Sequence, residues 1–270
     1  MMAATGVEQG RAVQVMTKLG SVLIAWCWMW LCMPAQALPA NGVVLQIGFG
    51  SNKPPYIFEA ERRGLELDIV VAAARRAGME VQPFFAPMER LQSMLQQGRL
   101  DGIATTNPYS GLHAYFSQPY LEYHNVVVAL AQRQLTIHNI SDLQRYSISS
   151  FQRARQLLGP SFEAMASTNT RYREEGDQKI RNRLLYAGRV DVIVGDWRII
   201  SHFTQEMSAE QGRLPAVTVY QLFAPTPYQM AFRYQWQRDN FDRGLALLRQ
   251  SGAYREIEAR YDEAAVHAQP

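Results

Sequence analysis

Polar side chains follow two short apolar segments, and their chemistry suits the recognition of a small polar molecule. Thr105, Thr106 and Asn107 come directly after one segment, and Asp196 comes shortly after the other. Hydroxyl and amide groups donate and accept hydrogen bonds, whereas a carboxylate accepts them and attracts positive charge. Each of these residues also has a purely structural interpretation: Thr and Asn are common in turns, and an Asp before a helix caps it.

Tyr56 and two arginines complete the set of candidate ligand-binding residues. Tyr56 follows Pro54 and Pro55, and its ring would stack on a ligand or else pack on the surface of its own lobe. Arg90 and Arg153 are candidate anion clamps, because a guanidinium binds a carboxylate through two charge-assisted hydrogen bonds. The alternative for each arginine is a solvated position on a helix.

The sequence lacks the motifs of the common catalytic and metal sites. Its five histidines form no His-Glu-x-x-His motif, and there is no Gly-x-Ser-x-Gly elbow or glycine-rich phosphate loop. Both cysteines, Cys27 and Cys32, lie in a segment that we expect to be removed. We therefore expect no metal, no cofactor and a binding function without catalysis.

Two similar segments, 95–104 and 185–194, show how the fold would position these groups. Each segment ends a helical pattern, passes through Gly98 or Gly188 and Arg-x-Asp, and enters a short apolar run. The glycine suits a helix C-cap that needs a left-handed residue, and the apolar run is typical of a buried strand. Ligands of open α/β sheets bind at the carboxyl ends of strands. The repeat thus predicts two α/β lobes that face each other across a cleft.

Hydrophobic periodicity predicts alternating strands and helices along both lobes. The expected strands are 43–48, 81–85, 126–130, 146–150, 217–222 and 228–233, besides the two in the repeats. The expected helices begin near residues 64, 87, 154, 162, 180, 241 and 254. This order is typical of mixed α/β lobes with parallel sheets.

Composition and the N-terminal segment indicate where the protein works and which class of partner it does not bind. The 270 residues carry a net charge of +3 with acids and bases interspersed, which argues against nucleic-acid binding. Residues 1–37 combine a basic start, an apolar stretch and an A-x-A site, so we predict a signal peptide cleaved after Ala37. An uncleaved anchor is the alternative. Trp26 and Leu31 precede the cysteines, where a lipid-anchor site needs a small residue. The expected product is a periplasmic monomer.

The order of these motifs resembles the family 3 extracellular solute-binding proteins. The resemblance is carried by Pro54-Pro55-Tyr56, the Gly64 to Asp68 segment, the two repeats, Phe116 to Tyr120, Asp196 and the segment from Gly252 to Ile257. It implies an α/β, two-lobe type II periplasmic binding protein fold, with two Rossmann-like lobes joined by crossing strands near 126–131 and 228–233. Lobe 1 would comprise 41–127 and 232–270, and lobe 2 would comprise 128–231.

One departure bears on the ligand. Amino-acid receptors of this family usually carry Thr-x-x-Arg before the Phe-Ser pair, and that arginine binds the ligand's carboxylate. Here Asn107 and Ser110 hold the two positions, so Arg90 or Arg153 would have to supply the charge. By the same resemblance, Asp196 would meet a ligand ammonium. The resemblance is to a divergent, transporter-orphan-like branch, which leaves the ligand amino-acid-like but unidentified.

These observations predict a receptor that closes by a hinge motion around one small polar solute. Tyr56, Arg90 and residues 105–107 would contact the solute from one lobe, and Arg153 and Asp196 from the other. The closed form would deliver the solute to a membrane permease. The alternatives are a receptor that docks on a membrane sensor protein, and a dehydratase-like periplasmic enzyme on the same fold.

Overall fold

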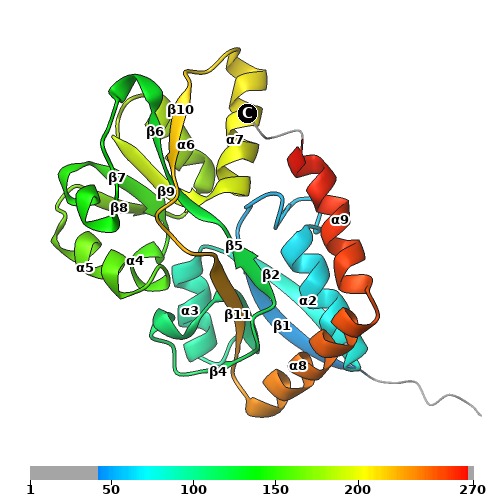
Figure 1. Cartoon of the computed structure of the whole chain (residues 1–270). Helices are drawn as coiled ribbons and strands as arrows, with labels where there is room; N and C mark the ends of the chain where they lie inside the picture. The colour runs from blue at the N-terminus through cyan, green and yellow to red at the C-terminus, as the bar shows by residue number, and fades with distance from the viewer. Residues whose placement is uncertain (1–41, 267–270) are drawn as a thin grey trace, which may run out of the picture. The chain divides into compact units, whose positions relative to one another are not determined.

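The computed structural model describes residues 42–266, and side chains through residue 261. The expected signal peptide, including Cys27 and Cys32, lies outside the described residues. Figure 1 shows two β-sheets, each with helices packed on it. None of the described helices is long and apolar enough to cross a membrane.

The first sheet has six strands, and its core is parallel. In sheet order these are β2 (Met79–Ala86), β1 (Val43–Gly50), β3 (Gly102–Thr106), β11 (Thr226–Phe232) and β4 (Tyr115–Phe116), while β5 (Leu121–Tyr123) also pairs with β11. Strands β2, β1 and β3 run parallel, and β11 runs antiparallel to β3. The carboxyl ends of β1, β2 and β3 therefore lie at one edge.

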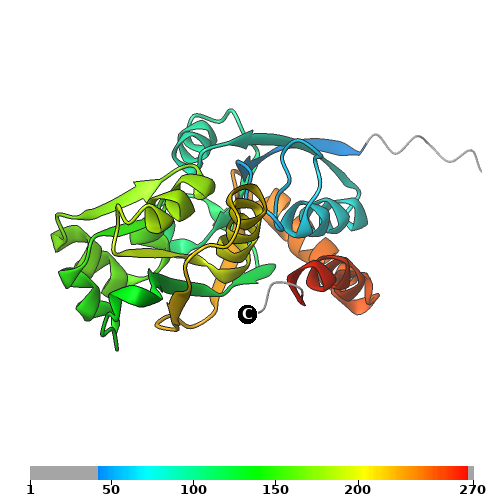
Figure 2. The same ribbon diagram turned by 90° about the horizontal axis from the view of Figure 1, so that it is seen from above.

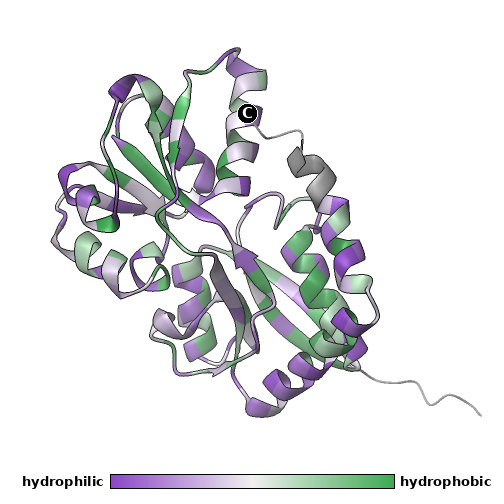
Figure 3. Ribbon diagram, in the orientation of Figure 1, coloured by the Kyte–Doolittle hydropathy of each residue, from purple (hydrophilic) through white to green (hydrophobic). Residues whose placement is uncertain are grey.

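Helices cover both faces of the first sheet. On one face, apolar residues of α2 (Leu65–Arg76), α8 (Gln235–Gln250) and α9 (Ala253–Val266) share a core with β1 and β11. Figure 2 shows these three helices packed together, and Figure 3 shows how strongly hydrophobic α2 is. On the other face, α3 (Met88–Gln96) packs on β3 through Leu91 and Leu95. The short η1 (Pro108–Ser110) follows β3.

The second sheet has five strands with helices on both faces. Its order is β10 (Val217–Tyr220), β6 (Asn125–Leu130), β9 (Val192–Asp196), β7 (Ile148–Phe151) and β8 (Tyr172–Glu175). Its helical segments are α4 (Ala154–Leu157), α5 (Pro160–Thr168), α6 (Gln178–Tyr186), α7 (Trp197–Gln211), η2 (Ala131–Arg133) and η3 (Ile140–Arg145). The α4, α5 and η3 helices share one apolar core with the sheet, and α6 and α7 share the other.

The chain passes between the sheets twice, and the two passages lie side by side. It leaves the first sheet between β5 and β6 and returns between β10 and β11; β5 pairs with β11, and β6 pairs with β10. The predicted α/β two-lobe fold is confirmed.

The chain changes sheets slightly earlier than the lobe boundaries expected at 127/128 and 231/232. Residues 125–127 belong to a strand of the second sheet, and residues 226–231 belong to a strand of the first. An apolar run predicts a strand but does not say which sheet the strand joins. The lobes as folding units stay a prediction.

Local sequence signals explain the repeated helix ends. Gly98 and Gly188 adopt φ values of 71° and 66°, the left-handed conformation that a side chain disfavours. Asp177 caps α6 by accepting a hydrogen bond from the Lys179 amide, so this helix begins two residues before the expected start at 180. The repeats thus place β3 and β9 at corresponding points of the two sheets.

Candidate functional site

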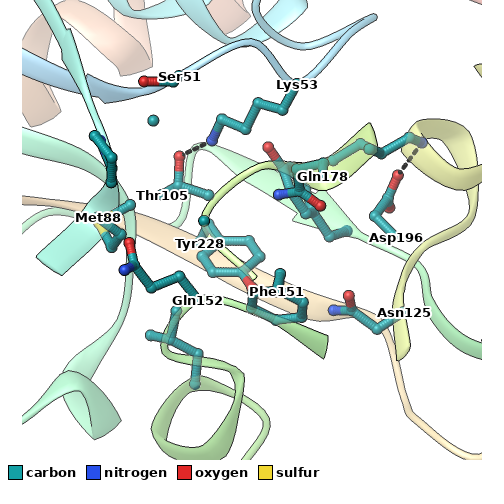
Figure 4. Close-up of a pocket in the computed structure, with 16 residues that line it drawn as sticks. Ser51, Lys53, Met88, Thr105, Asn125, Phe151, Gln152, Gln178, Asp196 and Tyr228 are labelled. Atoms are coloured by element: carbon teal, nitrogen blue, oxygen red, sulfur yellow. Dashed lines mark hydrogen bonds between the residues drawn. The ribbon is translucent and has the colours of Figure 1, made fainter. Parts of the chain in front are cut away.

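A small cavity of about 50 Å³ lies between the two sheets. Residues of the first sheet and its loops line one side, namely Gly50, Ser51, Lys53, Pro87, Met88, Thr105, Tyr123 and Tyr228. Residues of the second sheet and its helices line the other, namely Asn125, Phe151, Gln152, Leu157, Gly176, Gln178, Asp196 and Ile199. Figure 4 shows the polar groups of both sides converging on this space. The site is therefore formed jointly by the two halves of the fold.

A buried ion pair includes Lys53, one of the residues that line the first side of the cavity. Lys53, in the loop after β1, places its Nζ 2.7 Å from Oε2 of Glu66, and the two residues are only 4% and 0% exposed. Lys53 also donates a hydrogen bond to Oγ1 of Thr105. Burial lowers the pKa of Lys53, and the neighbouring Glu66 carboxylate opposes this shift. The lysine charge is thus compensated within the protein.

Glu66 lies at the centre of a larger network of hydrogen bonds. Its carboxylate accepts hydrogen bonds from the hydroxyls of Tyr120, Tyr123 and Thr105. Burial and the Glu66 charge hold the pKa of both tyrosines well above the ordinary value, so both remain neutral donors. The Tyr120 oxygen accepts from the Thr105 amide at 3.0 Å, and Thr105 has a left-handed φ of 55°. The network therefore holds Thr105 in a conformation that a threonine rarely adopts.

Asp196, at the end of β9, is a structural cap and a cavity-lining residue at once. Its Oδ1 accepts from the Ile199 amide at 3.2 Å, which caps α7, and its Oδ2 accepts from the His124 amide at 2.8 Å. The carboxylate is 2% exposed, and burial raises its pKa, while these hydrogen bonds oppose the shift. The two interpretations of Asp196 from the sequence are therefore compatible.

Two amides beside Asp196 have oxygen atoms without a partner. Asn125 is the direct cross-strand partner of Asp196, so the two side chains share one face of the sheet. The Asn125 Nδ2 donates to Thr226 Oγ1 at 3.0 Å, but its buried Oδ1 accepts no hydrogen bond. Gln178, the first residue of α6, likewise has a buried Oε1 without a donor. Both oxygens are buried, and neither has a donor within hydrogen-bond distance.

Comparison with known proteins decides the family. The model of the bacterial extracellular solute-binding proteins, family 3, matches residues 45–264. The chain belongs to this family. A search of curated proteins finds no match. Family membership makes this chain a solute-binding protein that works outside the cytoplasm.

Solved structures share the fold of this family 3 protein at low sequence identity. The arginine-, lysine-, histidine-binding protein ArtJ from Geobacillus stearothermophilus has a TM-score of 0.66 at 18% identity, over 80% of this chain and 94% of that chain. A histidine kinase sensor domain similar to periplasmic binding proteins gives 0.69 at 20%, over 81% and 95%. The ancestral amino acid-binding protein AncCDT-1, a precursor of cyclohexadienyl dehydratase, gives 0.62 at 18%, over 81% and 95%. At these identities the likeness shows the fold alone.

Of the seven residues predicted for the site, Thr105 and Asp196 line the cavity. Tyr56 lies directly behind the wall: its ring stacks on Tyr123 with 4.1 Å between centroids, and its hydroxyl donates to Asp196 Oδ2 at 3.3 Å. It therefore joins the two halves of this solute-binding protein, and Tyr123 presents its side chain to the cavity.

Arg153 joins the two halves at another point. Its Nη2 donates to the Ser110 carbonyl oxygen at 2.8 Å, and its Nη1 lies 3.4 Å from Glu89 Oε1. The neighbouring Gln152 Oε1 accepts from the Glu89 amide at 3.0 Å. Position 110, where amino-acid receptors of the family carry an arginine, thus holds a serine whose backbone carbonyl binds Arg153. The guanidinium predicted as an anion clamp is not among the groups that line the cavity.

The other three predicted residues also lie off the cavity wall. The Arg90 guanidinium lies 5.7 Å from the centroid of the Phe84 ring. Thr106 is fully buried, and its Oγ1 has no hydrogen-bond partner. Asn107 donates to the Leu157 carbonyl at 3.1 Å and so spans the two halves. Contact between any of these residues and a solute stays a prediction.

Sequence reasoning missed Lys53, Asn125 and Gln178. Lys53 follows the carboxyl end of β1, the same position that singled out Thr105, so the rule of strand ends could have found it. Asn125 stands at the start of β6, and only the pairing of β6 with β9 brings it beside Asp196. Nothing in the local sequence distinguishes Gln178 from other glutamines on helices.

Proposed function

We propose that this chain is a periplasmic receptor that encloses one small polar solute between its two α/β halves and presents the closed form to a membrane permease. The observation that carries the proposal is the cavity between the sheets, to which both halves contribute polar groups. Lys53, Thr105, Asn125, Gln178 and Asp196 are the proposed contacts.

The size of the cavity limits the solute. A buried water needs about 10–15 Å³ of such space, so a cavity of about 50 Å³ has room for about four water-sized groups. A short-chain molecule fits this space, whereas a side chain as long as that of arginine would require the halves to separate further.

The mechanism of the proposed receptor is hinge closure at the two paired passages between the sheets. A solute that contacts both sides stabilises the closed form, because it can make the full set of contacts only there. Direct hydrogen bonds between the halves also stabilise the closed form. They join Tyr56 to Asp196, Asn107 to the Leu157 carbonyl, and Arg153 to the Ser110 carbonyl.

A membrane signalling protein is the second candidate partner. Its support is that the fold occurs in a histidine kinase sensor domain. An enzymatic role has weaker support: the Lys53 ammonium, the one basic group among the described residues that line the cavity, is held in an ion pair with Glu66. Among the described residues, no group of three or more His, Cys, Asp or Glu side chains is placed to hold a metal.

A ligand screen tests the proposed function. The protein is unfolded and refolded to remove carried-over solute, and its melting temperature is measured with amino acids, amines, dicarboxylates, small aromatic acids and short peptides. A solute at a hundred times its dissociation constant adds roughly 2.7 kcal/mol, which raises the melting temperature by about 5–11 °C in a domain of this size. Small-angle X-ray scattering with a hit should show a smaller radius of gyration. A melting temperature that no compound class raises would contradict a solute receptor.

A further inference from the structure

The charged groups of the cavity wall are few and almost fully buried. Among the described residues that line the cavity, Lys53 carries the one positive charge and Asp196 the one negative charge. These residues are 4% and 2% exposed. A charged solute loses its hydration on entering the cavity, and only a charge that the protein has not already compensated can offset this loss. The contacts of Lys53 and Asp196 therefore decide which class of solute can bind.

The positive charge of Lys53 is compensated within the first half of the fold. Its Nζ lies 2.7 Å from Oε2 of Glu66, which is completely buried, and it donates a hydrogen bond to Oγ1 of Thr105. The same nitrogen lies 5.5 Å from the centroid of the Tyr123 ring. An anionic solute would have to compete with a carboxylate that is already in place.

The negative charge of Asp196 is satisfied in the same way. Its Oδ1 accepts from the Ile199 amide, and its Oδ2 accepts from the His124 amide and the Tyr56 hydroxyl. The buried charge of Arg181 interacts favourably with this carboxylate, although Arg181 does not line the cavity. A cationic solute would therefore meet a carboxylate that already has three donors and a cation nearby.

The partly accessible polar groups of the wall are uncharged. Ser51, Gln152 and Gln178 are half-buried, and Figure 4 shows them on different sides of the cavity. Oε1 of Gln152 accepts from the Glu89 amide at 3.0 Å, and Oε1 of Gln178 is buried, so each amide has its nitrogen left to donate. Together with the Ser51 hydroxyl, these nitrogens suit a solute that accepts hydrogen bonds through an uncharged oxygen.

Apolar side chains complete the wall. Met88, Phe151 and Leu157 line the cavity, and so do the rings of Tyr123 and Tyr228, which pack edge to face with centroids 4.7 Å apart. Ligand pockets commonly combine such surfaces with a few polar groups that fix the orientation of the ligand. A short carbon chain with one carbonyl group matches this combination.

We propose that Glu66 sets the specificity of the cavity by neutralising Lys53, and that the solute is a short-chain molecule without a charged group, whose carbonyl oxygen, as in a carboxamide, takes its hydrogen bonds from the uncharged donors of the wall. Glu66 contacts Lys53 rather than the solute, so it acts as a positioning residue. This proposal rests on the proposed function and specifies its class of solute.

The same assignment accounts for the departure at position 110. The amino-acid receptors of the family use an arginine there to bind the ligand's carboxylate, whereas this chain has Ser110. A solute without a carboxylate needs no such arginine, and Lys53 is held by Glu66 instead.

Isothermal titration calorimetry with four matched probes tests the class of solute. The probes are propionamide, propionate, propylamine and alanine, which share a three-carbon chain and differ in charge, and the protein is refolded free of solute. Propionamide and propionate also have nearly the same shape. Propionamide should bind at least about tenfold more tightly than each of the other three, because it alone enters the cavity without burying an uncompensated charge.

The variant Glu66→Gln tests the assigned residue. It keeps the size of the side chain and an oxygen for the Tyr120 and Tyr123 hydroxyls, but it removes the charge that compensates Lys53. Propionate should bind this variant at least about tenfold more tightly than it binds the unsubstituted protein, because the freed ammonium can form a charge-assisted hydrogen bond with it. The affinity for propionamide should change by less than about threefold.

Two further variants complete the series. Lys53→Met combined with Glu66→Gln removes both charges, so it should keep the preference for propionamide and gain no affinity for propionate. This double variant leaves neither charge of the pair uncompensated, so it remains a test if Glu66→Gln fails to fold. Glu61→Gln removes a carboxylate at an exposed position and is the matched control, which should leave both affinities unchanged. Thermal melts establish that the variants fold.

The outcomes separate this proposal from the proposed function. Tighter binding of propionate, propylamine or alanine than of propionamide would overturn the uncharged class and leave a solute receptor. An affinity for propionate that does not rise in folded Glu66→Gln would remove Glu66 from the control of specificity. No heat from any of the four probes would contradict the uncharged class, and the ligand screen would then decide separately whether the chain is a receptor.

Discussion

The phenol oxygen of Tyr56 lies 3.3 Å from Oδ2 of Asp196, so one hydrogen bond joins the two halves of the fold at the cavity wall. Both residues are at most 2% exposed. Burial and the nearby Asp196 charge raise the pKa of Tyr56 well above its ordinary value, so the phenol keeps its proton and remains the donor.

Removal of this hydroxyl should loosen the closed form. Tyr56→Phe keeps the ring that stacks on Tyr123 but deletes the donor, and we expect a loss of about 1 kcal/mol in the free energy of unfolding. Urea denaturation measures this loss. Tyr109→Phe, at a site where the side chain is 60% exposed, is the control and should change the free energy by less than about 0.5 kcal/mol. Equal effects of the two substitutions would refute the role of the bond.

Removal of the Lys53 charge should lower the free energy of unfolding by more than removal of the Tyr56 hydroxyl does. Lys53→Met leaves the Glu66 carboxylate buried without its cation, and breaking a buried pair in this way costs about 3–5 kcal/mol. The double variant with Glu66→Gln should recover part of the loss, since it removes the uncompensated charge. Guanidinium denaturation of both single variants and the double variant gives the coupling energy. A coupling energy near zero would mean that the ion pair contributes nothing to stability.

The raised pKa of Asp196 predicts how stability depends on pH. The folded state binds a proton here more tightly than the unfolded state, whose pKa is about 3.9. Between that value and the raised pKa the folded state carries more protons, so this residue contributes less stability as pH rises through the window and adds no further change above it.

The variant Asp196→Asn isolates this contribution. Asparagine also caps helices well, so α7 keeps its cap. The free energy of unfolding, measured between pH 4 and pH 7, should rise for the variant relative to the unsubstituted protein as pH rises. A difference between the two proteins that stays constant with pH would show that Asp196 has the same pKa in both states.

Arg153 should affect the strength of solute binding without affecting its selectivity. Arg153→Asn removes the bonds to Ser110 and Glu89, and Asn tolerates the left-handed backbone at this position, where φ is 70°. Loss of about 1 kcal/mol from the closed form should weaken all solutes about fivefold. Calorimetry should therefore find the ratio of dissociation constants for any two solutes from the ligand screen unchanged.

The control for this substitution is Arg189→Asn, at an exposed position of the second half. Selective loss of carboxylate-bearing solutes in Arg153→Asn would instead make Arg153 the anion clamp that the sequence suggested.

The fold was predictable because its signals are local and repeated. The glycines at 98 and 188, the Arg-x-Asp pairs and the apolar runs identify β3, β9 and the helices before them without any knowledge of long-range contacts. The two lobes followed from finding this unit twice. The sheet that β6 joins did not follow, because its pairing with β9 and β10 depends on residues more than 60 positions away.

The site was predictable only where a residue ends a strand. Thr105 and Asp196 were found by that rule, and both line the cavity. Arg153 was a candidate because it too follows a predicted strand and because its charge would replace the arginine missing at position 110, but its guanidinium contacts Ser110 and Glu89 instead. Tyr123 and Tyr228, on β5 and β11, also line the cavity. Such assignments depend on the direction of a side chain, which spacing alone does not determine.

The network around Glu66 has a consequence for the order of events in capture. Lys53, Thr105, Tyr120 and Tyr123 all bond to Glu66 within the first half of the molecule, so separation of the halves would break none of these bonds. An arriving solute therefore encounters one rigid, preassembled surface. The opposite wall would complete the enclosure afterwards, so residence time should depend on the second half and the encounter rate on the first.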